Sequence, residues 1–277
     1  MPDINRCGMI YTDKVVIITG GSKGIGEGCA RVFTDAGTKV AICARDIKAG
    51  EELAKELNSK GPGTCHFIRC DVSKPEEIKN LVDRTIELYG RIDCLINNAG
   101  YHPGFKSIDG FSLKDFQDIL QTNLISYFVA CKFALPHLRK TKGNIINMGS
   151  LAGIIGQEGG TIYSATKGAI SSFTKSLAIE EARYAVRVNC ISPGNILSYN
   201  RITGVAASEN PEALNKLIDS WQPTGRSGIN EEVGQLCLFL ASHAASYITG
   251  IDVIISGGSE LGYGIKYPLT FLKDKRK

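Results

Sequence analysis

The sequence contains no long hydrophobic run. Of its 277 residues, 43% are hydrophobic, yet no stretch approaches the ~18 consecutive apolar residues that a membrane-spanning helix needs. Residues 1–14 also contain no apolar core of the kind that marks a secretory signal peptide. We therefore expect no membrane span and a cytoplasmic location.

The cysteines have no regular spacing. The nine cysteines are odd in number, none lies in a CxxC pair, and most fall in apolar runs such as 40–43 and 188–190. Disulfide frameworks and structural zinc sites both need regular cysteine spacing. The sequence thus predicts no metal site and no disulfide framework, and it favours small buried side chains in a reducing compartment.

Strong charge and internal linkers are also absent. The formal net charge is only +4 and the charges are dispersed, so we expect a small-molecule partner and no nucleic-acid partner. No segment rich in proline and serine and no run of like charge divides the chain. We therefore expect residues 1–277 to form one domain.

Short apolar runs alternate with amphipathic segments along the chain. Such runs are typical of strands that are buried on both faces of a parallel sheet. The predicted strands are 14–19, 39–43, 65–70, 93–96, 144–147, 187–191 and 251–255. This alternation predicts an α/β fold, a single Rossmann-like doubly wound domain with a seven-stranded parallel sheet and helices on both faces.

Three segments of this domain are distinguished. Its core covers 14–264, and 265–277 form a C-terminal tail. Between them, 197–227 show little periodicity beyond a short helix near 211–220. Long irregular segments in compact domains often bind ligands, so we expect 197–227 to be a substrate loop.

A glycine-rich turn follows the first predicted strand and precedes a helical pattern. Gly20, Gly24 and Gly26 have the spacing GxxxGxG. In this position glycines let the backbone approach a pyrophosphate, and the helix N-terminus offers free N–H groups. A tight turn without a ligand is the alternative interpretation.

The second predicted strand ends at Ala44 and Arg45. A fold that binds NAD would place an acidic residue there to hold the ribose 2′-hydroxyl. Arg45, together with Lys23 from the glycine turn, instead makes a cationic clamp suited to a 2′-phosphate. We therefore expect NADP(H) to be preferred, with NAD(H) possible if Asp46 takes the acidic role.

Two further strand ends carry candidate cofactor residues. Asp71 follows the third strand, where it is placed either to accept a hydrogen bond from adenine or only to cap a turn. The fourth strand ends at Asn97, Asn98, Ala99 and Gly100, whose small residues permit close approach of a cofactor.

The candidate catalytic group is Ser150, Tyr163 and Lys167. Tyr163 and Lys167 are four residues apart on a predicted helix, so they share one face. A nearby ammonium stabilises a phenolate, which lets tyrosine exchange a proton near neutral pH. Ser150, after the fifth strand, is placed to hydrogen-bond the reacting oxygen. A tyrosine packed beside a solvated lysine is the alternative.

Taken together, these motifs resemble the signature set of the short-chain dehydrogenase/reductase family. The resemblance rests on Thr19-Gly-x-x-x-Gly-x-Gly26, Asn97-Asn-Ala-Gly100, Asn123, Ser150, Tyr163-x-x-x-Lys167 and Pro193-Gly194. It implies that Tyr163 is the general acid/base, that Lys167 lowers its pKa and binds the nicotinamide ribose, that Ser150 holds the substrate oxygen, and that Asn123 organises a proton relay through water.

The resemblance also implies a set of cofactor contacts and a homotetramer. With the clamp residues, the expected cofactor-binding residues are Gly20, Ser22, Lys23, Gly24, Ile25, Gly26, Arg45, Asp71, Val72, Asn98, Ala99, Gly100, Tyr163, Lys167, Pro193, Gly194, Ile196 and Ser198. The tetramer would pack the Tyr163 helix and the long Asn123 helix at an interface.

Within that family, segments 134–139, 187–196 and 260–264 look most like the 17β-hydroxysteroid dehydrogenase type 14 branch. Ala44 and Ser198 depart from that branch, which has an acidic residue and a threonine there. The expected activity is interconversion of a secondary alcohol and a ketone, on an apolar substrate such as a steroid. Expected substrate-facing residues are Tyr101, His102, Gln157, Tyr199, Trp221 and Tyr263.

Two other functions are compatible with the sequence. An enoyl-thioester reductase of the same fold would reduce a carbon–carbon double bond, although the Ser150 and Tyr163 pair favours carbonyl chemistry. A non-catalytic NADP-binding sensor or scaffold would not need Asn123, Ser150, Tyr163 and Lys167, all of which are present.

Overall fold

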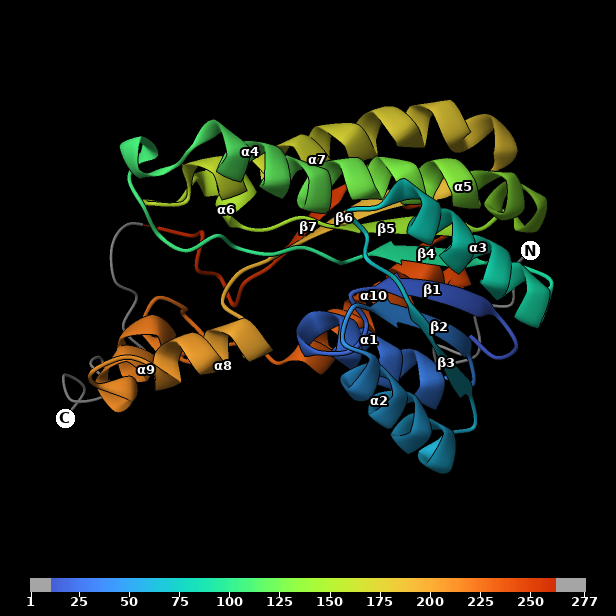
Figure 1. Cartoon of the computed structure of the whole chain (residues 1–277), viewed down its shortest axis with the longest axis horizontal. Helices are drawn as coiled ribbons and strands as arrows, with labels where there is room; N and C mark the ends of the chain where they lie inside the picture. The colour runs from blue at the N-terminus through green and yellow to red at the C-terminus, as the bar shows by residue number, and fades with distance from the viewer. Residues whose placement is uncertain (1–10, 263–277) are drawn as a thin grey trace, which may run out of the picture.

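Residues 11–262 are described by a computed structural model, in which the seven predicted strands form one parallel sheet (Figure 1). Its strand order is β3-β2-β1-β4-β5-β6-β7, and all six pairings are parallel. The strands are β1 (Val15–Thr19), β2 (Lys39–Ala44), β3 (Thr64–Arg69), β4 (Cys94–Asn97), β5 (Asn144–Met148), β6 (Arg187–Pro193) and β7 (Asp252–Ile255). Each observed strand lies within two residues of its predicted bounds.

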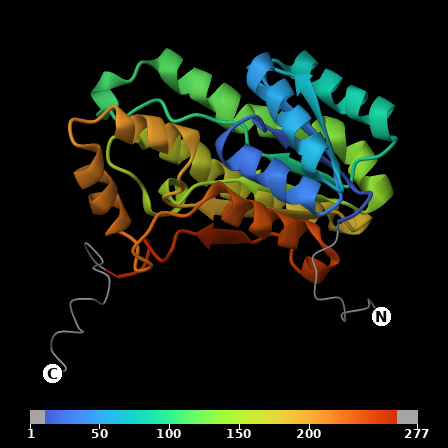
Figure 2. The same ribbon diagram turned by 90° about the horizontal axis from the view of Figure 1, so that it is seen from below.

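Helices cover both faces of the sheet, as predicted. One buried cluster joins the sheet to α1 (Gly24–Asp35), α2 (Ile47–Lys60) and α10 (Asn230–Ala241). A second cluster joins the other face to α3 (Pro75–Tyr89), α5 (Ser126–Thr141) and α7 (Thr161–Glu181). Figures 1 and 2 show these two layers on either side of the sheet. The α/β fold and its single domain are therefore confirmed.

The long helix expected around Asn123 is interrupted by a wider turn. It consists of α4 (Leu113–Leu120), a π-helical turn (Gln121–Ile125) and α5. Such wide turns insert one residue and often occur at functional sites. Here the π-helical turn contains Asn123, which is fully buried.

The predicted loop 197–227 contains more helix than its sequence pattern indicates. It forms α8 (Tyr199–Ala206), which was not predicted, and α9 (Pro211–Asp219), close to the predicted short helix. A backbone bridge between Ile196 and Gly228 closes the base of the segment, and Asn195 Nδ2 donates to Gln222 Oε1 at 2.8 Å. We call residues 197–227 the lid. In Figure 1 it projects beyond the strand ends.

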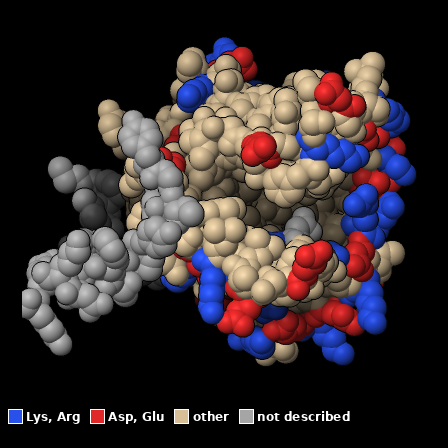
Figure 3. Space-filling model, turned by 90° about the vertical axis from the view of Figure 1, so that its left-hand side faces the viewer, with Lys and Arg blue, Asp and Glu red and all other residues tan. Residues whose placement is uncertain are grey.

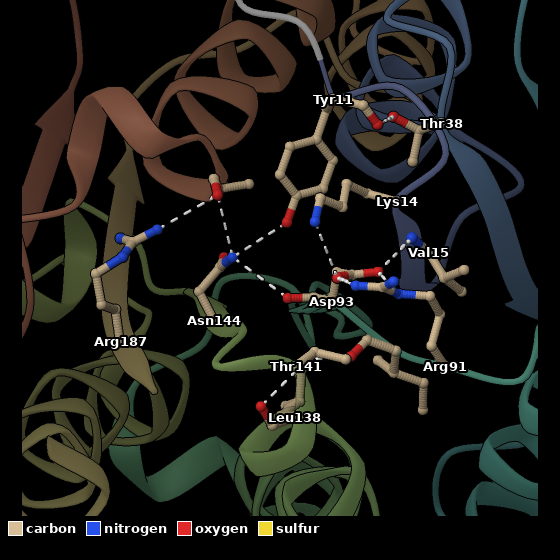
Figure 4. A network of polar contacts seen from close by, with 12 residues as sticks. Tyr11, Lys14, Val15, Thr38, Arg91, Asp93, Leu138, Thr141, Asn144 and Arg187 are labelled. Atoms are coloured by element: carbon tan, nitrogen blue, oxygen red, sulfur yellow. Dashed lines mark hydrogen bonds and ion pairs between the residues drawn. The ribbon is translucent and has the colours of Figure 1, made fainter. Parts of the chain in front are cut away.

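A polar network joins the amino ends of three central strands (Figure 4). Asp93 Oδ2 accepts from Val15 N at 2.9 Å and from Arg91 Nε at 2.8 Å. Asn144 Nδ2 donates to Ala241 O at 3.2 Å, which attaches β5 to the end of α10. These bonds fix the strand ends opposite the site and leave the carboxyl ends for function.

Two expectations from composition hold for the described residues. All eight cysteines within 11–262 are buried free thiols, as expected of small core side chains. Among helices in the same range, none has the length and apolar character needed to span a membrane.

Replacing Arg187 with methionine should destabilise the fold. Its guanidinium NH2 donates to Leu240 O at 2.6 Å, and NH1 donates to Ile248 O at 3.2 Å. Because the variant removes this donor from Leu240 O and leaves Ile248 O with only Asn189 Nδ2, we expect a loss of about 1–3 kcal/mol in the free energy of unfolding. Urea denaturation measures this change in the free energy of unfolding. The control Arg183→Met removes an exposed guanidinium and should stay within about 0.5 kcal/mol; equal losses in both variants would contradict this role of Arg187.

Candidate active site

The carboxyl ends of the strands surround a cavity of about 790 Å³. Figure 3 shows this face hollowed at its centre, with a largely uncharged rim. Of the expected cofactor residues, all except Gly26 line the cavity, together with Ser150, Tyr101, His102 and Tyr199. Ligands of open parallel sheets bind at this edge, so the cavity is the candidate active site.

The glycine turn at the cavity is packed too closely for larger side chains. Gly20 has φ of +64°, and a Cβ there would lie 2.9 Å from Ala99 Cα. A Cβ on Gly26 would lie 2.2 Å from Gly20 O and 2.6 Å from Asn98 Nδ2. Gly26 therefore allows the turn to pack closely without lining the cavity, while Gly20 and Gly24 border the cavity. This is a backbone cradle of the kind that a pyrophosphate fits.

The adenosine side of the cavity has both charge signs. Lys23 Nζ lies 3.3 Å from Asp46 Oδ2, and Arg45 lines the cavity beside them. Asp71 Oδ1 accepts from Ser73 N at 3.0 Å and from Ser73 Oγ at 2.8 Å. Asp71 thus makes the turn-capping contact that was one of its two predicted roles, and it also borders the cavity.

Ser150, Tyr163 and Lys167 meet at the cavity wall. Ser150 follows β5, whereas Tyr163 and Lys167 lie one turn apart on α7. Burial raises the pKa of the Tyr163 phenol above its usual value of 10.0, and a hydrogen bond with Ser150 opposes this rise. Lys167 Nζ lies 5.9 Å from the centroid of the Tyr163 ring.

Lys167 is a buried ammonium with one fixed acceptor. Its Nζ donates to Met148 O at 2.7 Å, which joins α7 to the end of β5. Burial lowers the pKa of Lys167 from 10.5 to about 8, so the ammonium is the main form at neutral pH. A positive charge is therefore kept close to Tyr163.

Asn123 lies behind this group and outside the cavity lining. Its Oδ1 accepts from Tyr101 N at 3.0 Å, and its Nδ2 donates to Tyr101 O at 2.9 Å. A Cβ on Gly100 would lie 3.1 Å from Asn123 Oδ1 and 3.7 Å from Lys167 Nζ. The amide of Asn123 thus fixes the loop after β4 beside the lysine.

Of the five expected substrate residues that the structure describes, Tyr101, His102 and Tyr199 line the cavity. His102 lies over Tyr163, with the two ring centroids 4.6 Å apart, and its Nε2 is 3.1 Å from Gln157 Oε1. Gln157 and Trp221 are outside the cavity lining, and Tyr199 borders the cavity on the side of Lys23. Tyr263 and the tail 265–277 lie outside the described residues.

Several lining residues were not foreseen. They are Cys43, Cys70, Ser73, Thr122, Met148 and Gly149. Most of them lie next to strand ends at which other site residues were predicted. Their closeness in sequence to those strand ends was the signal that could have identified them. Thr122 borders the cavity from the π-helical turn, for which the sequence pattern gave no sign.

Comparisons with known proteins identify the family of this chain. The family model described as enoyl-(acyl carrier protein) reductase matches residues 20–260. The L-fucose dehydrogenase of Bos taurus is 45% identical over 259 residues, which cover 94% of each chain. That of Oryctolagus cuniculus is 44% identical over 257 residues, which cover 93% of this chain and 88% of the relative. This chain belongs to the short-chain dehydrogenase/reductase family.

A solved structure of this family supports the same conclusion. The Pseudomonas aeruginosa RhlG/NADP active-site complex has a TM-score of 0.84 and 31% sequence identity to this chain. The match covers 91% of this chain and 98% of that structure. As a short-chain dehydrogenase/reductase with dehydrogenase and reductase relatives, the protein is an oxidoreductase acting on CH–OH groups.

Replacing Gly26 with alanine should disrupt the cradle. Because the new methyl group would overlap Gly20 O and the Asn98 amide, we expect a loss of about 1–3 kcal/mol in unfolding free energy and loss of NADPH binding. Thermal unfolding and fluorescence titration measure the two effects. Gly204→Ala is the control, since a Cβ there meets nothing within 4 Å. Retained NADPH binding in Gly26→Ala would contradict the cradle assignment.

Proposed function

We propose that the protein is an NADP-preferring dehydrogenase that interconverts a secondary alcohol and the corresponding carbonyl compound. The observation that carries this proposal is the meeting of Ser150, Tyr163 and Lys167 at the wall of the cavity. These are a hydroxyl donor, a proton-exchanging phenol and a buried ammonium, the set that carbonyl chemistry requires.

Each residue of this group has one role in the proposed reaction. In oxidation, Tyr163 takes the hydroxyl proton of the substrate, and in reduction it returns that proton to the carbonyl oxygen. Ser150 donates a hydrogen bond to the same oxygen, and the charge of Lys167 stabilises the phenolate form of Tyr163. When bound, the nicotinamide exchanges a hydride with the substrate carbon. Asn123 keeps the Tyr101 loop in place and, as the family resemblance implies, organises a proton relay.

The cradle supports binding of a dinucleotide. Gly20, Gly24 and the N-terminus of α1 would hold its pyrophosphate, since the turn excludes side chains there. Asp71 and Val72 would contact the adenine, Asn98 the ribose side, and Ile196 with Ser198 the carboxamide. Arg45 and Lys23 would hold a 2′-phosphate, which is why we favour NADP(H) over NAD(H).

The substrate that we propose to test first is a hydroxylated sugar. Relatives 44–45% identical over nearly the whole chain are named L-fucose dehydrogenase. The side chains of His102 and Gln157 form a polar pair over Tyr163, which suits a hydroxylated substrate. Phe105, 70% exposed and stacked beside His102, favours a second candidate, a bulky apolar alcohol or ketone such as a steroid.

The homotetramer implied by the resemblance is part of this proposal. Large apolar side chains are exposed on the two helices expected at its interface, or directly beside them, including Ile125, Phe128 and Ile179. Tyr263, outside the described residues, stays a predicted substrate contact, as does Trp221.

Tyr163→Phe should abolish the reaction and spare cofactor binding. Removing the phenol oxygen removes the proton donor and acceptor, so we expect turnover to fall about 10²–10⁴-fold, with NADPH affinity nearly unchanged. Initial rates are measured with the best substrate of a panel containing L-fucose, a steroid alcohol and an enoyl thioester. The control Tyr184→Phe removes a phenol at the far end of α7 and should retain full activity.

This panel also separates the alternatives. A preference for the enoyl thioester would favour the enoyl-reductase reading, and no turnover with any member but intact NADPH binding would favour a sensor or scaffold. Unchanged alcohol oxidation by Tyr163→Phe would contradict the catalytic role of the tyrosine.

Arg45→Ala should weaken NADPH binding far more than NADH binding. The guanidinium contributes a charge-assisted contact only to a 2′-phosphate, so we expect about 10-fold or more weaker NADPH binding. Side-by-side fluorescence titration measures both cofactors. Lys48→Ala is the control, because Lys48 lies in the first turn of α2 and does not line the cavity. An equal loss of affinity for NADPH and NADH in Arg45→Ala would contradict the assignment of Arg45 to the 2′-phosphate.

A further inference from the structure

The ammonium of Lys23 lies between two groups that come from separate parts of the chain. On one side, Asp46 Oδ2 is 3.3 Å away. On the other, the centroid of the Tyr199 ring is 4.8 Å from Lys23 Nζ, within the ~6 Å over which a cation and an aromatic face attract each other. All three residues line the cavity. Lys23 is therefore held at the cavity wall before any cofactor is present.

The backbone at the start of the lid fixes the position of Tyr199. Leu197 N donates to Gly228 O at 2.8 Å, and Asn230 Nδ2 donates to Leu197 O at 3.3 Å. A Cβ on Gly24 would lie 3.6 Å from Ser198 Cβ and 3.7 Å from Tyr199 N. The lid thus begins in contact with the glycine turn that carries Lys23, and Tyr199 is the first residue of α8.

Asp46 is equally fixed. Its Oδ1 accepts from Ala49 N at 3.1 Å and so caps α2. Because Oδ1 is occupied by the helix, the carboxylate presents Oδ2 to Lys23. A bound phosphate would repel the Asp46 carboxylate and attract the Lys23 ammonium. The Tyr199 ring is uncharged, so it would not repel the phosphate. Of the two neighbours, only Tyr199 can hold Lys23 in place when a phosphate is bound.

We infer that Tyr199 is a positioning residue for cofactor choice, whose ring holds the Lys23 ammonium ready for the 2′-phosphate of NADP(H). This inference rests on the proposed NADP preference and assigns Tyr199 to the cofactor side, where the sequence had suggested a substrate contact. A side chain that is already ordered loses less rotamer freedom on binding. The ring therefore strengthens phosphate binding without touching the phosphate.

The effect is limited by exposure. Lys23 and Asp46 side chains are 45% and 46% exposed, and Tyr199 is 53% exposed. Water weakens a contact at such a site, so we expect the ring to change NADPH affinity about 2- to 5-fold. A change of that size is measurable, and we expect it for NADPH, which carries the 2′-phosphate, and not for NADH, which lacks it.

The experiment is fluorescence titration of the full chain with NADPH and with NADH. Tyr199→Leu removes the aromatic face, and we expect it to weaken NADPH binding about 2- to 5-fold with NADH unchanged. Tyr199→Phe retains the face and should bind both cofactors as the unmodified protein does. In a Lys23→Met background, Tyr199→Leu should have no further effect, since the residue acts through Lys23.

Any of the following results with the variants would overturn the inference: equal weakening of NADPH and NADH binding in Tyr199→Leu, the same loss in Tyr199→Phe, or an undiminished effect of Tyr199→Leu without Lys23. The proposed cofactor choice is tested separately by the unmodified protein. If the unmodified protein bound NADPH and NADH equally well, this result would contradict both the proposed NADP preference and the inference about Tyr199. A preference for NADPH that Tyr199→Leu leaves intact would overturn the inference alone.

Discussion

One threonine hydroxyl determines how closely the two central strand ends approach. Thr19 Oγ1 accepts from Asn98 N at 2.9 Å and from Ala99 N at 3.0 Å, and Asn98 Nδ2 donates back to Thr19 O at 2.9 Å. These bonds join the ends of β1 and β4, so the glycine turn rests directly on the loop that follows β4. The small residues at these two strand ends permit this close approach, and the Asn123 amide then fixes the Tyr101 loop beside Lys167.

The candidate catalytic group includes a buried lysine, which lowers the stability of the fold. Lys167 is 5% exposed, and its ammonium is removed from water with one carbonyl as its acceptor. Burying a charge this way opposes folding, as the lowered pKa of Lys167 indicates. The surrounding sheet must supply the compensating stability, and the apolar clusters on both of its faces are extensive.

Strands and strand-end motifs were predictable because their signals are local. A strand buried on both faces must be almost wholly apolar, as β1 and β2 are, and its end is marked by the first glycine or polar residue. The covalent spacing of Tyr163 and Lys167 likewise fixes their relative position on a helix. Predictions of this kind need no knowledge of the partner element.

The features that escaped prediction depend on contacts between distant segments. The π-helical turn at Asn123 is supported by bonds to the Tyr101 backbone, which a helical pattern cannot encode. The pairing of Lys23 with Tyr199 spans most of the chain, so neither residue alone indicates the other.

The closed base of the lid has a consequence for how this enzyme could diversify. Because Ile196 and Gly228 are bridged, the segment leaves and rejoins the body at nearly one point, and its length has little influence on the sheet. Closing a longer loop costs little additional entropy. The lid is thus an exchangeable module: insertions, deletions or grafts between these two residues would change the surface beside the strand ends and leave the sheet intact.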